Sequence, residues 1–218
     1  MCSSDLAGTG HATALPGGVT AMLKSTPQQP VTDIQLLFRG AAMEATPWCG
    51  SAPKWTDAFF LRPVAVHPES RGVLQLASTD PRRHPLIRAN FLSVGKDLDM
   101  LVEGVRITRE VFAQAPMYPY RGEEMFPGPK VTTREDVVSF IRTTAVTAHH
   151  PCGTCRMGSD DKSVVDLDLR VRGVEGLRVI DASVMPDLVS TNINACVLMI
   201  AEKGADLVRG RAAPPSPL

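Results

Sequence analysis

The chain has 218 residues, 44% of them apolar, and its 23 lysine and arginine residues equal its 23 aspartate and glutamate residues in number. This size and composition allow a substantial hydrophobic core, in one large domain or two small ones. A formal net charge of zero gives no long-range attraction toward nucleic acid or an anionic membrane surface. We therefore expect a globular protein without a nucleic-acid partner.

Targeting and redox features of the sequence indicate where the protein is located in the cell. The longest apolar run, residues 195–201, is far shorter than the roughly 18 to 20 residues of a membrane-spanning helix, so we expect no transmembrane segment. Residues 1–6 lack the basic and apolar regions of a secretory signal. Five cysteines, an odd and scattered set, argue against a disulfide framework and favour a reducing compartment. We expect a cytoplasmic location.

The amino-terminal part of the chain predicts strands. Residues 7–30 are rich in Gly, Thr and Pro and have no period, which predicts an irregular segment. Strands are predicted at 33–38, 59–66 and 73–78, where β-favouring residues gather and partly alternate with polar ones. The prolines and basic residues of 81–91 predict a connector. Long connections between the strands indicate an antiparallel or mixed sheet.

Two helices are predicted next. In residues 97–115 apolar side chains recur at steps of three and four, and Pro116 is expected to end the helix. A second helix is predicted to begin after Thr133, because Thr133 and Asp136 have the spacing of a capping box.

The carboxy-terminal part predicts one more strand and one more helix. Residues 177–181 read as a short buried strand, and 194–209 carry apolar residues on one helical face. Strands first, then helices, then a strand and a helix indicate the α+β class. We expect the mixed or antiparallel sheet to pack with the first two helices, and the carboxy-terminal strand, loop and helix to form a separate segment after it.

A histidine-containing segment, His149-His150-Pro151, lies on the loop that follows the second predicted helix. A loop can present an imidazole to a pocket, although a histidine taken at random is more often a solvated or core side chain. Here the pair opens a segment punctuated by glycine and cysteine, which favours a functional role.

The segment Cys152-Gly153-Thr154-Cys155 has the C-x-x-C spacing of a redox dithiol or of half a zinc site. Cys2, Cys49 and Cys196 supply no second pair, and the preceding sequence lacks the βαβ pattern of a redox motif. We interpret the two thiols as ordinary small buried residues and predict no metal.

The start of the last predicted helix is a candidate ligand site. Backbone N–H groups at a helix start lack intrahelical partners and attract negative charge, such as the charge that develops at the N1–C2=O edge of a reduced flavin. The alternative is that Asn192 and Asn194 only cap and turn the chain.

Several segments of the chain form a set of motifs in a fixed order. They are Asp33-Ile34-Gln35-Leu36, Pro68-x-Ser70-Arg71-Gly72, His150-Pro151-x-Gly153-Thr154-Cys155-Arg156-Met157-Gly158, Gly176-Leu177-Arg178-Val179-Ile180-Asp181-Ala182-Ser183-Val184-Met185-Pro186, Asn192-x-Asn194 and Met199-Ile200-Ala201-Glu202-Lys203-x-Ala205-Asp206-Leu207. Together these motifs resemble the carboxy-terminal part of the glucose–methanol–choline (GMC) oxidoreductase family, most of all its choline and alcohol dehydrogenases.

The resemblance implies FAD-dependent oxidation of a primary alcohol to an aldehyde, with oxygen, a quinone or another electron acceptor. It implies that His150 takes the hydroxyl proton and that Asn192 holds the substrate oxygen. The positions that match flavin contacts in the family are Asp181, Ala182, Ile193 and Asn194. His149 stands where tyrosine is frequent, so the resemblance gives it only a supporting role.

The family's G-x-G-x-x-G fingerprint, which seats the ADP part of FAD, does not occur in these residues. We therefore expect a fragment whose FAD-binding domain is otherwise missing and which is inactive alone. Alternatives are a non-catalytic interaction domain or a small cysteine-based redox or metal-binding protein. The expected parts are a non-native leader (1–6), a substrate-binding portion (7–148), an active-site loop with the FAD-contacting segment (149–210) and a disordered tail (211–218).

Overall fold

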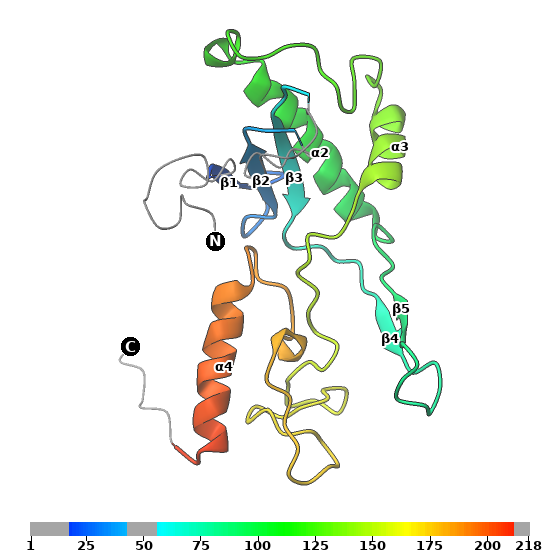
Figure 1. The fold of residues 1–218 in the computed structure, drawn as a ribbon, viewed down its shortest axis with the longest axis vertical. Coiled ribbons are helices and arrows are strands. Elements are labelled where there is room, and N and C mark those ends of the chain that lie inside the picture. The colour runs from blue at the N-terminus through cyan, green and yellow to red at the C-terminus, as the bar shows by residue number, and fades with distance from the viewer. Residues whose placement is uncertain (1–17, 43–55, 212–218) are drawn as a thin grey trace, which may run out of the picture. The chain divides into compact units, whose positions relative to one another are not determined.

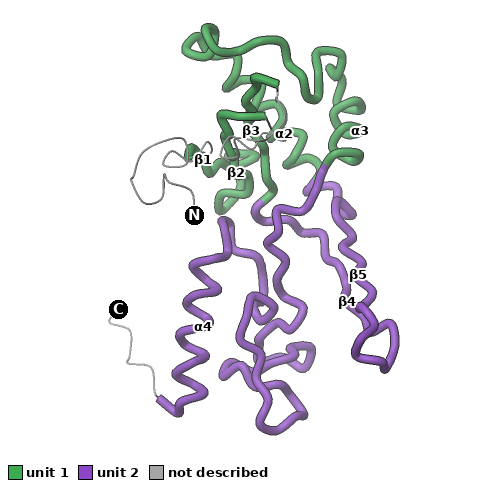
Figure 2. The backbone as a smooth tube through the Cα atoms, in the orientation of Figure 1, with its two compact units in different colours: residues 1–65, 98–144 green, residues 66–97, 145–218 purple. Residues whose placement is uncertain are grey.

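The structure is a computed structural model that describes residues 18–42 and 56–211. The described chain forms two compact units, shown in different colours in Figure 2. Unit 1 contains residues 18–42, 56–65 and Leu98–Thr144, and unit 2 contains Val66–Asp97 and 145–211. The expected leader at 1–6, Cys2, Cys49 and nearly all of the expected tail lie outside the described residues.

Unit 1 is built on a three-stranded antiparallel sheet with the strand order β1-β2-β3 (Figure 1). Its strands are β1 (Thr20–Leu23), β2 (Ile34–Arg39) and β3 (Phe60–Ala65). Ile34 pairs with Leu23 on one side and with Ala65 on the other. The predictions for β2 and β3 are confirmed, whereas the irregular segment predicted at 7–30 is wrong where β1 forms. β1 has only four residues, and its pairing with β2 is a long-range contact that no local period reveals.

Two helices complete unit 1, namely α2 (Gly95–Phe112), which belongs to this unit from Leu98 onward, and α3 (Arg134–Thr144). Ile34 and Leu36 of β2 form a buried cluster with Met100 of α2. A short η2 (Ala115–Met117) follows α2, so the helix ends three residues earlier than predicted and Pro116 lies in the 3₁₀ turn.

The predicted capping box at the start of α3 is present. The Asp136 N–H donates to Thr133 Oγ1 at 3.1 Å, and the Thr133 N–H donates to the Asp136 carboxylate at 3.3 Å. Each hydrogen bond satisfies a backbone donor that the helix itself leaves without a partner. α3 therefore begins where the sequence places it.

Unit 2 contains less regular structure. Its elements are β4 (Val73–Gln75) and β5 (Leu86–Arg88), which pair antiparallel, η3 (Ala182–Val184) and α4 (Asn194–Val208). β4 and α4 confirm the predicted strand and helix, with β4 shorter than expected. β5 lies inside the region predicted to be a connector, which corrects that prediction.

The strand predicted at 177–181 does not form. Its backbone instead bonds to a turn, because the Val171 N–H donates to Leu177 O at 3.0 Å and the Val179 N–H donates to Leu169 O at 3.1 Å. Arg170 and Arg178 form only an isolated bridge. The described chain thus has antiparallel sheets and three α-helices, as an α+β fold requires, but its carboxy-terminal part is turn, loop and helix without the expected strand.

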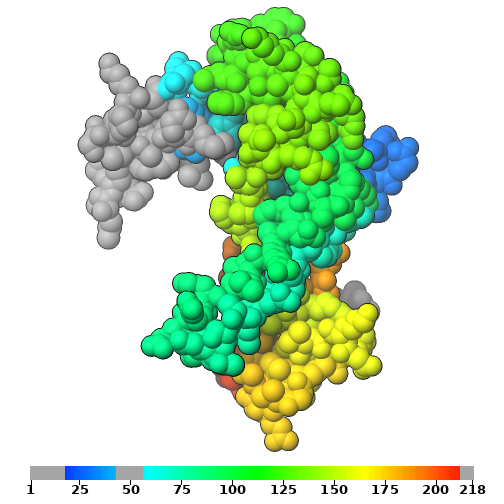
Figure 3. Space-filling model, turned by 90° about the vertical axis from the view of Figure 1, so that its right-hand side faces the viewer, coloured from blue at the N-terminus to red at the C-terminus, as the bar shows by residue number. Residues whose placement is uncertain are grey.

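The β4–β5 ribbon leaves large apolar side chains in solvent, and Figure 3 shows one face of it in blue-green. Exposed apolar residues of this ribbon and its flanks are Val73, Leu74, Leu76, Leu86, Ile87 and Phe91.

No helix among the described residues is long and apolar enough to cross a membrane.

Candidate active site

The segment after His150 is held against η3 by a short backbone ladder. Its three hydrogen bonds run from Gly153 N–H to Ala182 O (3.4 Å), from Cys155 N–H to Ser183 O (2.9 Å) and from Met157 N–H to Val184 O (2.8 Å). This ladder joins the histidine loop to the segment that carries two of the predicted flavin contacts.

The backbone turns sharply on both sides of His150. His149 has a φ of 62°, and its N–H donates to Thr147 Oγ1 at 3.0 Å. Gly153 has a φ of 84°, and a Cβ at that position would lie 3.3 Å from Met185 O. Left-handed backbone and a close carbonyl together favour glycine at 153. The half-buried His150 is therefore carried on a short, conformationally constrained loop.

Asp181 and Ala182, both predicted flavin contacts, lie at the start of η3. The Asp181 carboxylate accepts a hydrogen bond of 2.7 Å from the Ser183 N–H, so it caps this turn. Asp181 is exposed and Ala182 is half-buried. The aspartate therefore has a local structural role whether or not a cofactor is bound.

The other predicted residues lie at the start of α4. Ile193 is the N-cap of this helix, and it makes no side-chain cap hydrogen bond. The first turn holds no acidic side chain, and Asn194 there is exposed. Backbone N–H groups in such a turn can donate to a partly negative ligand atom. Asn192 is exposed and directly precedes this turn.

One hydrophobic cluster connects these pieces. Its buried members include Val184 and Met185, which follow the start of η3, together with Ile193 at the start of α4 and Ile200 within it. Cys152 packs against the same cluster from the histidine loop. The structure thus brings together the three backbone segments that carry all six predicted site residues, with His150 just before the ladder and Asn192 just before a buried anchor.

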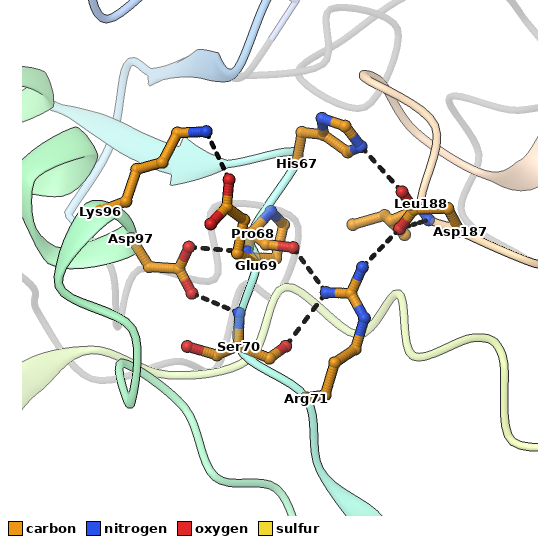
Figure 4. A network of polar contacts seen from close by, with 9 residues as sticks. All are labelled: His67, Pro68, Glu69, Ser70, Arg71, Lys96, Asp97, Asp187 and Leu188. Atoms are coloured by element: carbon orange, nitrogen blue, oxygen red, sulfur yellow. Dashed lines mark hydrogen bonds and ion pairs between the residues drawn. The ribbon is translucent and has the colours of Figure 1, made fainter.

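Sequence reasoning missed a polar contact beside this site (Figure 4). Arg71 Nη2 donates to Asp187 Oδ1 at 2.7 Å, and His67 Nε2 lies 3.2 Å from Asp187 Oδ2. The Leu188 N–H also donates to Asp187 Oδ1, at 2.8 Å. Partial burial raises the pKa of Asp187, but the hydrogen bonds from Leu188 and His67 and the charge of Arg71 outweigh it and hold the pKa below its usual value. Two motifs could have indicated this contact. Arg71 belongs to one of them, and Asp187 directly follows Pro186, the last residue of another.

The two thiols of the C-x-x-C pair are half-buried and free. Burial raises the pKa of Cys152, and the charge of Asp187 raises it further against the opposing effect of Arg71. A raised pKa disfavours the thiolate that redox exchange and metal binding need. Across residues 18–42 and 56–211, no group of three or more His, Cys, Asp or Glu side chains is placed to hold a metal ion.

A hollow of about 430 Å³ in unit 1 lies between α2 and α3 and contains none of the predicted site residues. Its charged groups already have protein partners: Arg109 donates to Val131 O at 2.8 Å and pairs with Glu124, and Arg106 pairs with Glu103. We do not assign a ligand to it.

In unit 2 the histidine loop, the turn η3 and the start of α4 all contribute to one hydrophobic core. Residues 68–201, more than half of the chain, match the family model described as GMC oxidoreductase. The chain belongs to the GMC oxidoreductase family, which confirms the resemblance seen in its motifs.

Individual relatives agree with this assignment. The chain is 49% identical over 141 residues to an oxygen-dependent choline dehydrogenase of Proteus mirabilis, a match that covers 65% of this chain and 25% of the relative. It is 48% identical over 146 residues to an oxygen-dependent choline dehydrogenase of Escherichia coli O157:H7, covering 67% and 26%. The aligned part of this chain thus spans about a quarter of the length of these relatives.

Solved structures with a similar fold are oxidases. A pyridoxine 4-oxidase from Mesorbium loti aligns with a TM-score of 0.77 at 29% identity, covering 89% of this chain and 38% of that one. A formate oxidase of Aspergillus oryzae, studied for modification of its FAD, aligns with a TM-score of 0.71 at 28% identity and covers 83% and 32%. Both comparisons therefore give oxidoreductases, and one of the structural relatives was studied for its FAD.

Proposed function

We propose that the chain is the carboxy-terminal portion of an FAD-dependent enzyme that oxidises a primary alcohol, choline or a similar molecule, to an aldehyde. The observation that carries this proposal is the family match over residues 68–201, because that stretch contains both His150 and Asn192. The curated relatives named as choline dehydrogenases favour a choline-like alcohol over other donors.

The start of α4 fits a flavin. Its first turn has neither a side-chain cap nor an acidic side chain, so its N–H groups can donate to the N1–C2=O edge without competition from a carboxylate. Ile193 and Asn194 would hold the cofactor at this turn, and Asp181 and Ala182 would contact it from the start of η3. Bound FAD would supply the hydride acceptor of the reaction.

His150 is the proposed general base. A neutral imidazole can accept the hydroxyl proton of the alcohol while the carbon-bound hydrogen leaves with its electron pair, so the alcohol loses one proton and one hydride. The His150 backbone lies just before Gly153 and the ladder, which limit the positions that the loop can take. Fixed orientation is a large part of what such a base contributes.

Asn192 is the proposed holder of the substrate oxygen. Its amide N–H can donate to the developing alkoxide, but an amide cannot accept a proton at neutral pH, so the base role falls to His150 alone. Its place directly before the buried Ile193 gives the asparagine a fixed backbone anchor.

Exposed side chains of α4 and free thiols bear on the surroundings of this chain. Leu198 and Met199 of α4 are exposed, with 60% and 58% of their surface in solvent, which supports an FAD-binding domain packed against this helix. Free thiols at three described cysteines support a reducing, cytoplasmic compartment. An electron acceptor, oxygen or another, would complete the cycle.

The test is to express the longest open reading frame that contains these residues and to record its visible spectrum before and after anaerobic addition of choline. We expect flavin absorption bands that bleach with choline. A matched control is the tetramethylammonium ion, which keeps the quaternary ammonium head of choline but has no hydroxyl, and we expect it to leave the bands unchanged. A colourless protein would overturn the proposal in favour of a non-catalytic interaction domain. Loss of the activity on replacing Cys152 and Cys155 by Ser would favour the cysteine-based alternative.

A further inference from the structure

The guanidinium of Arg71 is held in orientation by the carbonyl groups of its own turn as well as by Asp187. Its Nη1 donates to Pro68 O at 2.7 Å and to Ser70 O at 3.2 Å, while Nη2 donates to Asp187 (Figure 4). Three oxygen acceptors thus fix the plane of the fork. A pre-oriented guanidinium loses less freedom when it binds a carboxylate than a free one does.

The turn that carries Arg71 is itself anchored by a buried carboxylate. Asp97, with 1% of its surface exposed, accepts the Glu69 N–H at 2.7 Å and the Ser70 N–H at 2.8 Å. Ser70 Oγ accepts the Val94 N–H at 3.1 Å. The Arg71 and Asp187 side chains are 61% and 50% exposed. The backbone that carries the Arg71 cation is nevertheless held in place by these hydrogen bonds.

Asp187 stands between the two halves of the proposed site. On one side it follows η3 and Met185, the segment to which the histidine loop is bonded, and on the other it precedes Asn192 by five residues. The charge of Asp187 raises the pKa of Cys152, two residues after His150, and the charge of Arg71 lowers it. Asp187 is thus linked along the chain to the segment bonded to the histidine loop and to the loop that carries Asn192.

We propose that Arg71 and Asp187 are positioning residues that fix the loop 187–193, and through it Asn192, relative to the histidine loop held on η3. His67 is the second side chain that bonds to the same carboxylate, in addition to the Leu188 N–H. The proposal rests on the proposed function, because it assigns the pair a role in the reaction of His150 and Asn192. Neither residue touches the reacting atoms in this account.

The first test needs no activity. In the protein of the longest reading frame, Arg71→Ala should speed amide hydrogen exchange across residues 187–193. A matched control is Arg170→Ala, since Arg170 and Asp168 form an ion pair of 3.2 Å with side chains 57% and 50% exposed in the same unit. We expect the control to leave exchange at 187–193 unchanged. Unchanged exchange in Arg71→Ala would overturn the proposal.

The second test measures catalysis. Arg71→Ala and Asp187→Asn should each lower the limiting rate of anaerobic flavin reduction by about 10- to 100-fold, the usual size of effects that act by orienting another group, with a much smaller change in KM. Added guanidinium ion, far below denaturing concentrations, should restore part of the rate of Arg71→Ala. A merely structural loss would not respond to it. Arg170→Ala should keep the wild-type rate and show no such rescue.

Two results separate the possible failures. If Arg71→Ala reduces flavin at the rate of Arg170→Ala, the positioning role is wrong even where the loop exchanges faster. If the wild-type protein binds no flavin, the proposed function is wrong, and the exchange experiment still decides whether the ion pair orders residues 187–193.

Discussion

In unit 1 the buried side chains come from regular elements, with Ile34 and Leu36 of β2 packed on Met100 of α2. In unit 2 the buried cluster around Val165, Leu169 and Val184 comes largely from turns and from η3, with α4 along one side. Strands and helices satisfy their backbone groups internally, whereas turns must find partners in other turns. The difference explains why unit 2 depends on ladders such as that of 153–157 with 182–184, and why it can present polar side chains on loops.

The largest effects should come from emptying each core, and they should stay within its unit. Ile34→Ala in unit 1 and Ile200→Ala in unit 2 replace side chains that are 0% and 4% exposed, and each should cost about 2–5 kcal/mol. Amide exchange should accelerate in β2 for the first variant and at residues 169–179 for the second. Equal acceleration in both regions from either variant would contradict the separation of the two cores.

Loss of the proposed oxygen holder should act on rate rather than on stability. Asn192→Ala should slow flavin reduction by about 10²–10³-fold, since removal of one donor to a developing oxyanion has effects of this size. Stopped-flow mixing with choline measures the rate of flavin reduction. The Tm of thermal unfolding should change little, because Asn192 is exposed. Asn192→His is the matched control, because it keeps an N–H donor and should retain more of the rate. Equal losses in both variants would exclude the donor role.

Each unit also has a helix glycine that permits close packing. A Cβ on Gly104 would lie 2.6 Å from Pro63 Cβ in unit 1, and a Cβ on Gly204 would lie 2.4 Å from Ile180 Cγ2 in unit 2. We expect Gly104→Ala to cost about 1–3 kcal/mol and Gly204→Ala less, because the ring of Pro63 is rigid while the Ile180 side chain can rotate.

Denaturant unfolding measures both costs. Gly95→Ala is the control, since nothing lies within 4 Å of the added Cβ, and it should be neutral or slightly stabilising. A larger loss for Gly204→Ala than for Gly104→Ala would contradict the difference in rigidity.

The smallest predicted effect is at the cap of α3 in unit 1. Thr133→Ala should cost about 0.5–2 kcal/mol of unfolding free energy, as losses of helix caps do. Hydrogen bonds from Thr133 lower the pKa of Asp136, so their stabilisation is complete above the ordinary carboxyl pKa and is lost as the pH falls through the lowered value. The difference in unfolding free energy between Thr133→Ala and the wild type should therefore become smaller at acidic pH. A difference that becomes larger at acidic pH would contradict the lowered pKa of Asp136.

The predictability of the fold depends on the length and pattern of each element rather than on the unit to which it belongs. The helices α2, α3 and α4 were predictable because apolar residues recur along them at the period of a helix, and the Thr133–Asp136 cap marks the start of α3. β2 was predictable because β-favouring residues gather in it. β1 and β5 are too short to show a period and exist through their partners. The apolar residues of 177–181 suggested a strand, but their hydrogen-bond partners lie in a turn at 169–171.

The site was predictable only as far as its motifs extend. The motifs led to His150, Asn192 and the residues proposed to contact FAD, and the structure places their segments on one core. The contact of Arg71 with Asp187 spans 116 positions, and no local pattern gives such a pairing. Long-range polar contacts between loops are therefore what the sequence left out.

The central claim is that the catalytic residues lie in unit 2 and that His150 is the general base. The most direct test compares the anaerobic rate of flavin reduction by choline in the wild-type protein, His150→Ala and His84→Ala, an exposed histidine of the same unit. The account predicts a fall of about 10²–10⁴-fold for His150→Ala and no change for His84→Ala. A rate for His150→Ala within a few-fold of wild type would contradict it.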